Sequence, residues 1–164
     1  MAFVSKNEIN QFDFSDCKII EVKYSQGQLV MKLESLIVLE NNTQNANYTK
    51  SYADTVEMVL SDCAIESVIL AGYKVYDAND ILVEEVQDKA FEADKYSEII
   101  EKTKDAYLYR FIKVSDDEGY VYDFEVEQSE PGEIMDLRND TYVFRVKFSD
   151  SVFTWDRYLN RVQN

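Results

Sequence analysis

Two alternating stretches, YVYDFEVE (120–127) and TYVFRVKF (141–148), decide the fold. In both, every second residue is apolar and usually aromatic. Most of the intervening residues near the middle of each stretch are charged. Successive side chains of a β-strand point to opposite faces, so this pattern predicts two strands with one face on a core and the other in water. The turn-forming residues Glu130-Pro131-Gly132 mark the loop between them.

The same pattern extends over much of the remaining chain. Gln26-Gly27 and the tetrapeptide 77–80 are turn-like, and each is flanked by alternating segments, which predicts two β-hairpins. The Asn-rich stretch 41–51 is polar and predicts an exposed loop. The further strands are expected at 18–25, 28–39, 52–60, 64–76, 81–86 and 107–114.

Helical spacing occurs in two places. Residues 92–104 carry apolar side chains at helical intervals, and Glu98 and Lys102 form a favourable i,i+4 pair, so we expect one helix there. Near the end of the chain, the spacing of four apolar residues fits a short C-terminal helix, with a closing strand as the alternative; they are Trp155, Tyr158, Leu159 and Val162.

These elements predict a mainly β protein. We expect an antiparallel β-sandwich or a curved sheet of about eight to ten strands, with one α-helix at about 92–104 and a short C-terminal helix. The 164 residues suit a single domain spanning 1–164. A chain of this size buries roughly 68–70% of its unfolded surface, so a core can form without metal or disulfide bonds.

The chain is strongly acidic, with 17 basic and 32 acidic residues and a formal net charge of −15. Such a charge repels phosphate groups, so nucleic acid and anionic membranes are unfavourable partners. A basic protein is a compatible partner, although an acidic surface also serves solubility alone. An unpaired outer strand could in addition support a homo-oligomer.

No apolar run approaches the ~20 residues that cross a bilayer, and the sequence MAFVSKNEINQF (1–12) lacks the features of a signal peptide. With two cysteines and no export signal, we expect a cytoplasmic protein with reduced thiols. The cysteines belong to a repeated motif, Ser15-Asp16-Cys17 and Ser61-Asp62-Cys63. We interpret each copy as a turn followed by a strand whose first inward residue is a buried cysteine.

The chain contains no histidine. This excludes Ser-His-Asp and Cys-His catalysis and histidine-ligated metal sites. The four glycines are isolated, so no phosphate-binding loop is present. Three alternatives to the structural interpretation of the Ser-Asp-Cys motif are weaker. They are a zinc site of the two cysteines and aspartates, a nucleophilic cysteine, and a Cys17–Cys63 disulfide. We therefore predict no catalytic residues, no metal and no cofactor.

One segment stands out by charge. Between Val114 and Leu137 there are nine acidic residues and neither lysine nor arginine. This predicts an acidic face for a basic partner, formed by Asp116, Asp117, Glu118, Asp123, Glu125 and Glu127. The competing interpretation is a solvated strand face on which Asp123, Glu125 and Glu127 pair with Arg145 and Lys147 of the neighbouring strand.

Two functions follow from these observations. The first is a soluble, non-enzymatic interaction module that uses its acidic face, in a regulatory or toxin-neutralising role. The alternative is a β-sandwich that binds a small ligand or carbohydrate, with weak hydrolase activity from paired carboxylates and with Trp155 stacking on a sugar ring.

Overall fold

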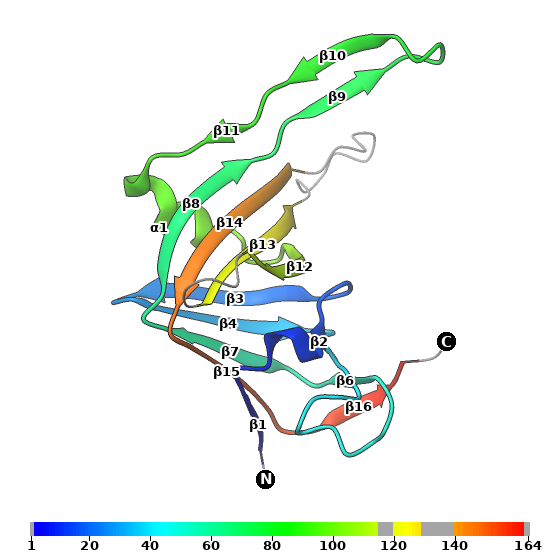
Figure 1. Ribbon diagram of the computed structural model, residues 1–164, viewed down its shortest axis with the longest axis vertical. Helices are drawn as coiled ribbons and strands as arrows, with labels where there is room; N and C mark the ends of the chain where they lie inside the picture. The colour runs from blue at the N-terminus through cyan, green and yellow to red at the C-terminus, as the bar shows by residue number, and fades with distance from the viewer. Residues whose placement is uncertain (1, 115–119, 129–139, 163–164) are drawn as a thin grey trace.

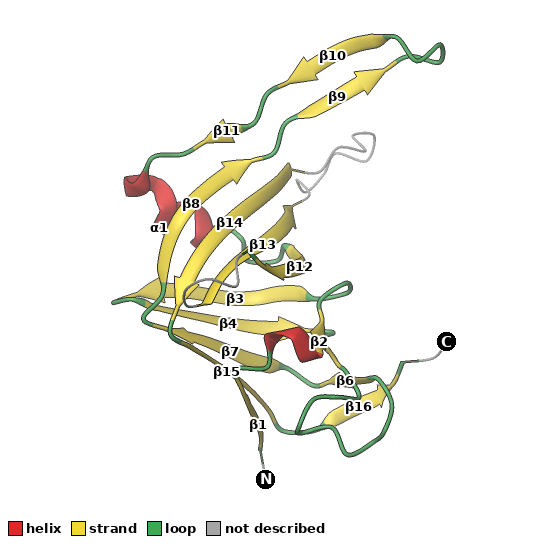
Figure 2. Cartoon of the chain, in the orientation of Figure 1, coloured by secondary structure: helices red, strands yellow, loops and turns green. Residues whose placement is uncertain are grey.

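The computed structural model describes residues 2–114, 120–128 and 140–162. Its body is an antiparallel sheet of ten strands in the spatial order β1-β15-β7-β4-β3-β12-β13-β14-β8-β11 (Figures 1 and 2). In that order the strands are Phe3–Lys6, Asp150–Trp155, Val56–Ser61, Gln28–Glu34, Lys18–Ser25, Tyr107–Lys113, Tyr120–Gln128, Asp140–Phe148, Ala64–Leu70 and Lys89–Ala90.

Two smaller sheets accompany the main one. A four-stranded sheet has the order β16-β6-β5-β2, and strands β9 and β10 form a separate pair. Their bounds are Tyr158–Arg161 (β16), Ser51–Ala53 (β6), Ile37–Val38 (β5), Phe12–Asp13 (β2), Tyr73–Tyr76 (β9) and Leu82–Val86 (β10). The helical elements are η1 (Ile9–Gln11), η2 (Ala93–Lys95) and α1 (Tyr96–Glu101).

The antiparallel, mainly β fold is confirmed, and the two opening stretches form neighbouring strands of the sheet. Strands β13 and β14 pair along their whole length, with Phe124 opposite Phe144 and Asp123 opposite Arg145. The two phenyl rings stack with their centroids 4.9 Å apart, and both side chains are buried. Alternation therefore placed the aromatic residues of both strands on the core face.

The sheet is continuous but bends where β3 meets β12. These strands share one paired position, Tyr107 opposite Lys18. Two more backbone hydrogen bonds hold the junction, from Leu108 N to Cys17 O (2.9 Å) and from Ile19 N to Ala106 O (2.8 Å). Beyond it the two halves of the sheet run in different directions (Figure 1). The bend lets both halves contribute side chains to one core.

Aromatic rings connect the two halves. Phe14 lies 5.4 Å from Phe111 of β12, measured between ring centroids, and 6.2 Å from Phe153 of β15. Phe111 in turn stacks on Phe124 at 5.4 Å. Aromatic pairs at such separations contribute about 0.5–1.5 kcal/mol beyond the area that they bury. The cluster therefore holds the bent sheet as one unit.

The predicted helix at 92–104 exists but is shorter. It spans η2 and α1, and the expected Glu98–Lys102 ion pair is present at 3.1 Å. Its end is set by Thr103, whose hydroxyl donates a hydrogen bond to the carbonyl of Ile100 at 2.6 Å. This bond closes a tight turn, and Asp105, at φ 71°, then directs the chain into β12.

The predicted C-terminal helix is wrong, and the alternative of a closing strand is correct. Trp155 is the last residue of β15 and is 1% exposed, packed on Phe3 with 5.7 Å between ring centroids. Tyr158 opens β16 and pairs with Ala53 of β6. Leu159, which a helix would have buried, is exposed. Pairing with a strand distant in sequence overrode the local helical spacing.

The structural interpretation of the Ser-Asp-Cys motif is confirmed. Cys17 and Cys63 are both buried, and the following residues open β3 and β8. Asp62 adopts φ 50° in the turn, and its carboxylate accepts a hydrogen bond from the Ser149 hydroxyl at 2.9 Å. The motif thus directs the chain into a strand.

Candidate functional site

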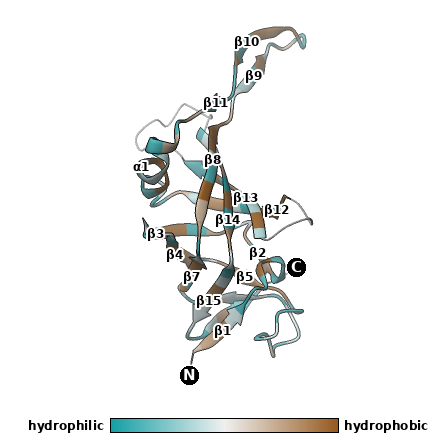
Figure 3. Cartoon of the chain, turned by 60° about the vertical axis from the view of Figure 1, so that its left-hand side comes forward, coloured by the Kyte–Doolittle hydropathy of each residue, from teal (hydrophilic) through white to brown (hydrophobic). Residues whose placement is uncertain are grey.

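The most distinctive surface feature is a projecting hairpin, residues 73–86, called the arm below. It consists of β9, β10 and the turn between them, and it extends beyond the body of the molecule in both views (Figures 1 and 3). None of its residues is buried, and only Val75 is even partly covered. An isolated two-stranded hairpin is at best marginally stable in water, so the two strands of the arm contribute little stability by themselves.

The arm is rich in exposed apolar side chains. Of the twelve large apolar side chains that are exposed among the described residues, six lie on it. Ile81 and Val83 are each 60% exposed and Tyr76 is 54% exposed. Single exposed apolar residues are ordinary, but their concentration on one projecting element is typical of an interaction surface. The six are Tyr73, Tyr76, Ile81, Leu82, Val83 and Val86.

Both faces of the arm carry these side chains. Tyr76 lies opposite Leu82 in the register, and Tyr73 lies opposite Val86. Directly opposite residues of an antiparallel pair share a face, and residues three apart on one strand lie on different faces. Tyr76 and Tyr73 therefore mark the two faces. A register shift at Val83 adds a bulge on β10.

Local contacts fix the arm at its tip and at its base. At the tip, the Asp77 carboxylate accepts hydrogen bonds from the backbone N–H groups of Asn79 (2.8 Å) and Ile81 (3.1 Å), which confirms the predicted turn. At the base, Gly72 N donates to the Asp88 carboxylate at 2.6 Å. A Cβ atom on Gly72 would lie only 2.0 Å from the carbonyl oxygen of Val86, so the close approach of these two backbone segments requires glycine.

The predicted acidic face is only partly described. Asp116, Asp117 and Glu118 lie outside the described residues. On β13, Asp123 is held by Arg145 through two hydrogen bonds, 2.8 Å and 3.0 Å long. The competing interpretation of a paired, solvated strand face is confirmed for this carboxylate.

The pairing differs from the expectation at the other two acids. Glu125 lies opposite Val143, and Glu127 lies opposite Thr141. Lys147 lies opposite Val121, so the expected pairing of these acids with Lys147 is wrong. Instead, Arg110 of β12 approaches Glu125 at 3.9 Å.

Tyr109 connects these acids to the sheet. It is half-buried at an irregularity in the pairing of β12 with β13. Burial, and then a hydrogen bond to Glu125 and the nearby charge of Glu127, raise the pKa of Tyr109 to about 12. The carboxylates of β13 thus have partners within the sheet. This weakens the acidic face as a candidate binding surface.

The cysteines are unsuited to chemistry. Both are free thiols, and burial raises the pKa of Cys63 to about 12 and that of Cys17 further above its usual range. Because the thiolate is the reactive form, neither cysteine is set up as a nucleophile. Across residues 2–114, 120–128 and 140–162, no three acidic or cysteine side chains gather in a way that could hold a metal ion.

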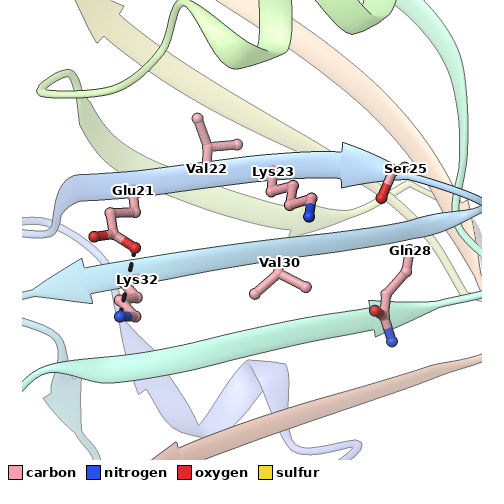
Figure 4. Close-up of a pocket in the computed structure, with 7 residues that line it drawn as sticks. All are labelled: Glu21, Val22, Lys23, Ser25, Gln28, Val30 and Lys32. Atoms are coloured by element: carbon pink, nitrogen blue, oxygen red, sulfur yellow. Dashed lines mark ion pairs between the residues drawn. The ribbon is translucent and has the colours of Figure 1, made fainter.

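A hollow of about 300 Å³ lies on the outer surface of β3 and β4 (Figure 4). It contains the Glu21–Lys32 ion pair (3.4 Å) and no aromatic side chain. Trp155, the ring expected to stack on a sugar, is buried in the core. The hollow therefore lacks the aromatic platform that the carbohydrate-binding alternative needs. Its lining residues are Glu21, Val22, Lys23, Ser25, Gln28, Val30 and Lys32.

The sequence patterns predicted this hairpin and its turn at 77–80, but not that the hairpin projects from the body. They also predicted one strand over 64–76, but this segment is interrupted at Ala71 and Gly72, between β8 and β9. Two signals could have found the break. The predicted strand exceeded the usual 3–10 residues, and a glycine inside a strand often marks a close approach of backbone.

Comparisons with protein-family models, with curated proteins and with solved structures found no match. In the described part of the chain, no helix has the length and apolar character to span a membrane.

Proposed function

We propose that this chain is a non-enzymatic protein-interaction module whose contact surface is the arm. The observation that carries the proposal is the concentration of exposed apolar side chains on an element that contributes none of its residues to the core. Removing apolar surface from water favours association, and part of that gain is offset by the loss of translational, rotational and side-chain freedom. A bound partner would thus supply the stabilisation that the arm lacks in the free chain.

The proposal keeps the interaction role predicted from the sequence and moves its location. The acids of β13 have partners within the sheet, whereas the apolar side chains of the arm face solvent. A regulatory or toxin-neutralising role is consistent with a module of this kind.

The experiment compares two matched triple variants as bait. The arm variant is Tyr76→Thr, Leu82→Thr and Val83→Thr, in which threonine preserves strand propensity. The control variant is Val4→Thr, Ile112→Thr and Leu159→Thr, which removes three exposed apolar side chains from strands of the body. Each bait is incubated with lysate of the cells that naturally make the chain, and bound proteins are identified and then purified.

We expect the unmodified chain and the control variant to bind the same protein, and the arm variant to bind it at least about tenfold more weakly, because central apolar contacts dominate binding energy. A third bait, with lysine at Asp123, Glu125 and Glu127, tests the original acidic face. Loss of binding by this bait and normal binding by the arm variant would contradict the proposal.

A further inference from the structure

We infer that the arm inserts into an apolar cleft of a basic protein, which contacts both of its faces. This inference rests on the proposed function and goes beyond it by naming the chemistry of the partner and the mode of binding. Two observations carry it: the placement of apolar side chains on both faces of the arm, and the charge that the arm presents among them.

The first observation concerns the two faces. One carries Tyr76 and Leu82, and the other carries Tyr73 and Val86. All four side chains are exposed. A partner that covered one face alone, as in docking on a flat surface, would leave an apolar pair of the other face in water. Insertion between two walls covers both pairs, so it removes more apolar surface from water.

The second observation concerns charge. The arm contains four acids, Asp77, Asp80, Glu84 and Glu85, and one base, Lys74, which gives it a formal charge of −3. Lys74 lies 3.9 Å from Glu85, so the one cation of the arm is already next to a carboxylate. A cleft that receives an element of this net negative charge gains favourable electrostatic interactions from lysine or arginine along its walls.

The same charge disfavours a second copy of this chain as the occupant. Each copy carries a formal charge of −15. Two-fold antiparallel pairing of β10 with itself about its central residue would also set Glu84 opposite Glu84 of the other copy. Like charges directly opposite each other destabilise a strand pair. A partner with lysine or arginine along its cleft attracts the acids of the arm and avoids this repulsion between like charges.

Photo-cross-linking from three tyrosine positions tests the inference. Each of Tyr73, Tyr76 and Tyr107 is replaced, one at a time, by p-benzoylphenylalanine, which is itself aromatic. Tyr73 and Tyr76 mark the two faces of the arm, and Tyr107 is a similarly exposed tyrosine on the body. The variants are made in the cells that naturally contain the chain, irradiated there, and the cross-linked peptides are identified.

We expect both arm positions to cross-link to one protein, at two separate peptides that lie near lysine or arginine, and Tyr107 not to cross-link to it. The purified complex should weaken at least about tenfold between 0.05 and 0.5 M salt, because screening shortens the range of charge attraction to a few ångströms.

Three outcomes would overturn the inference. Cross-links from one arm position alone would show docking of a single face, and the proposed function would stand. An adduct with a second copy of the chain, or with an acidic protein, would refute the charge reasoning. If neither arm position forms an adduct, both the inference and the proposed function fail.

Discussion

Because no residue of the arm is buried in the core, the same substitution should change the free energy of unfolding very differently at a core isoleucine and at an arm isoleucine. Ile19 lies on β3 opposite Leu33 and is fully buried. Ile81 lies between the arm turn and β10 and is 60% exposed. The same substitution, isoleucine to alanine, at both positions therefore compares core and arm with identical chemistry.

The expected magnitudes differ clearly. Replacing a buried isoleucine by alanine costs about 2–5 kcal/mol through lost burial and the cavity left behind, and we expect this for Ile19→Ala. Ile81→Ala should change the free energy of unfolding by less than about 0.5 kcal/mol, as is usual for exposed positions. With roughly 2–4 °C per kcal/mol for a chain of this size, Ile19→Ala should lower Tm by about 4–20 °C.

Urea denaturation followed by tryptophan fluorescence measures both changes. Trp155 is the single tryptophan and lies in the core, so its emission reports unfolding of the body. A loss above about 1.5 kcal/mol in Ile81→Ala would show that the arm packs on the body and would refute the reasoning. A loss below about 1 kcal/mol in Ile19→Ala would refute the assignment of the core.

Three further predictions concern the arm base, the β13 face and alkaline pH. In Gly72→Ala, the added Cβ atom would lie 2.0 Å from the Val86 carbonyl oxygen, so the backbone at the base of the arm must shift. Amide hydrogen exchange should therefore accelerate across residues 73–86 and stay unchanged in β13. Unchanged exchange in the arm would contradict this. A double-mutant cycle on Asp123 and Arg145 should give a coupling energy of about 0.2–1 kcal/mol, because the pair is largely solvated, and a coupling above ~2 kcal/mol would contradict that. The pKa of Tyr109 is raised from 10.0 to about 12, so the folded state favours the neutral phenol. The contribution of the neutral Tyr109 to folding stability is complete below pH 10 and is lost as the pH rises through about 12. Tyr109→Phe should therefore flatten the decline in stability over that interval, and an unchanged decline would exclude this tyrosine as its cause.

Several elements could be predicted from the sequence because their determinants are local. Alternation with period two identifies β13 and β14, and in both strands the aromatic residues face the core. The turn at Gln26-Gly27 and the turn that starts at Asp77 lie where turn-forming residues placed them. The buried position of Cys17 also follows from its place at the start of an alternating strand.

Predictions failed where a distant segment decided the outcome. Residues 155–162 have helical spacing, but Tyr158 pairs with Ala53 more than a hundred positions earlier in the chain. Asp123 has its expected partner Arg145, but the expected pairing of Glu125 and Glu127 with Lys147 fails because the register sets Lys147 opposite Val121. A register is set by the whole ladder, so pairs across it cannot be assigned from one strand alone.

The candidate site depended most on tertiary structure. In the sequence, Ile81 and Val83 resemble the isoleucines and valines that form the core, and hydrophobicity does not distinguish them. β8 ends at Leu70, and beyond Gly72 the chain continues as β9 away from the body, so the apolar residues of the arm remain in water. Strand formation follows from local side-chain alternation, whereas burial is decided by which segments of the folded chain lie close enough to exclude water.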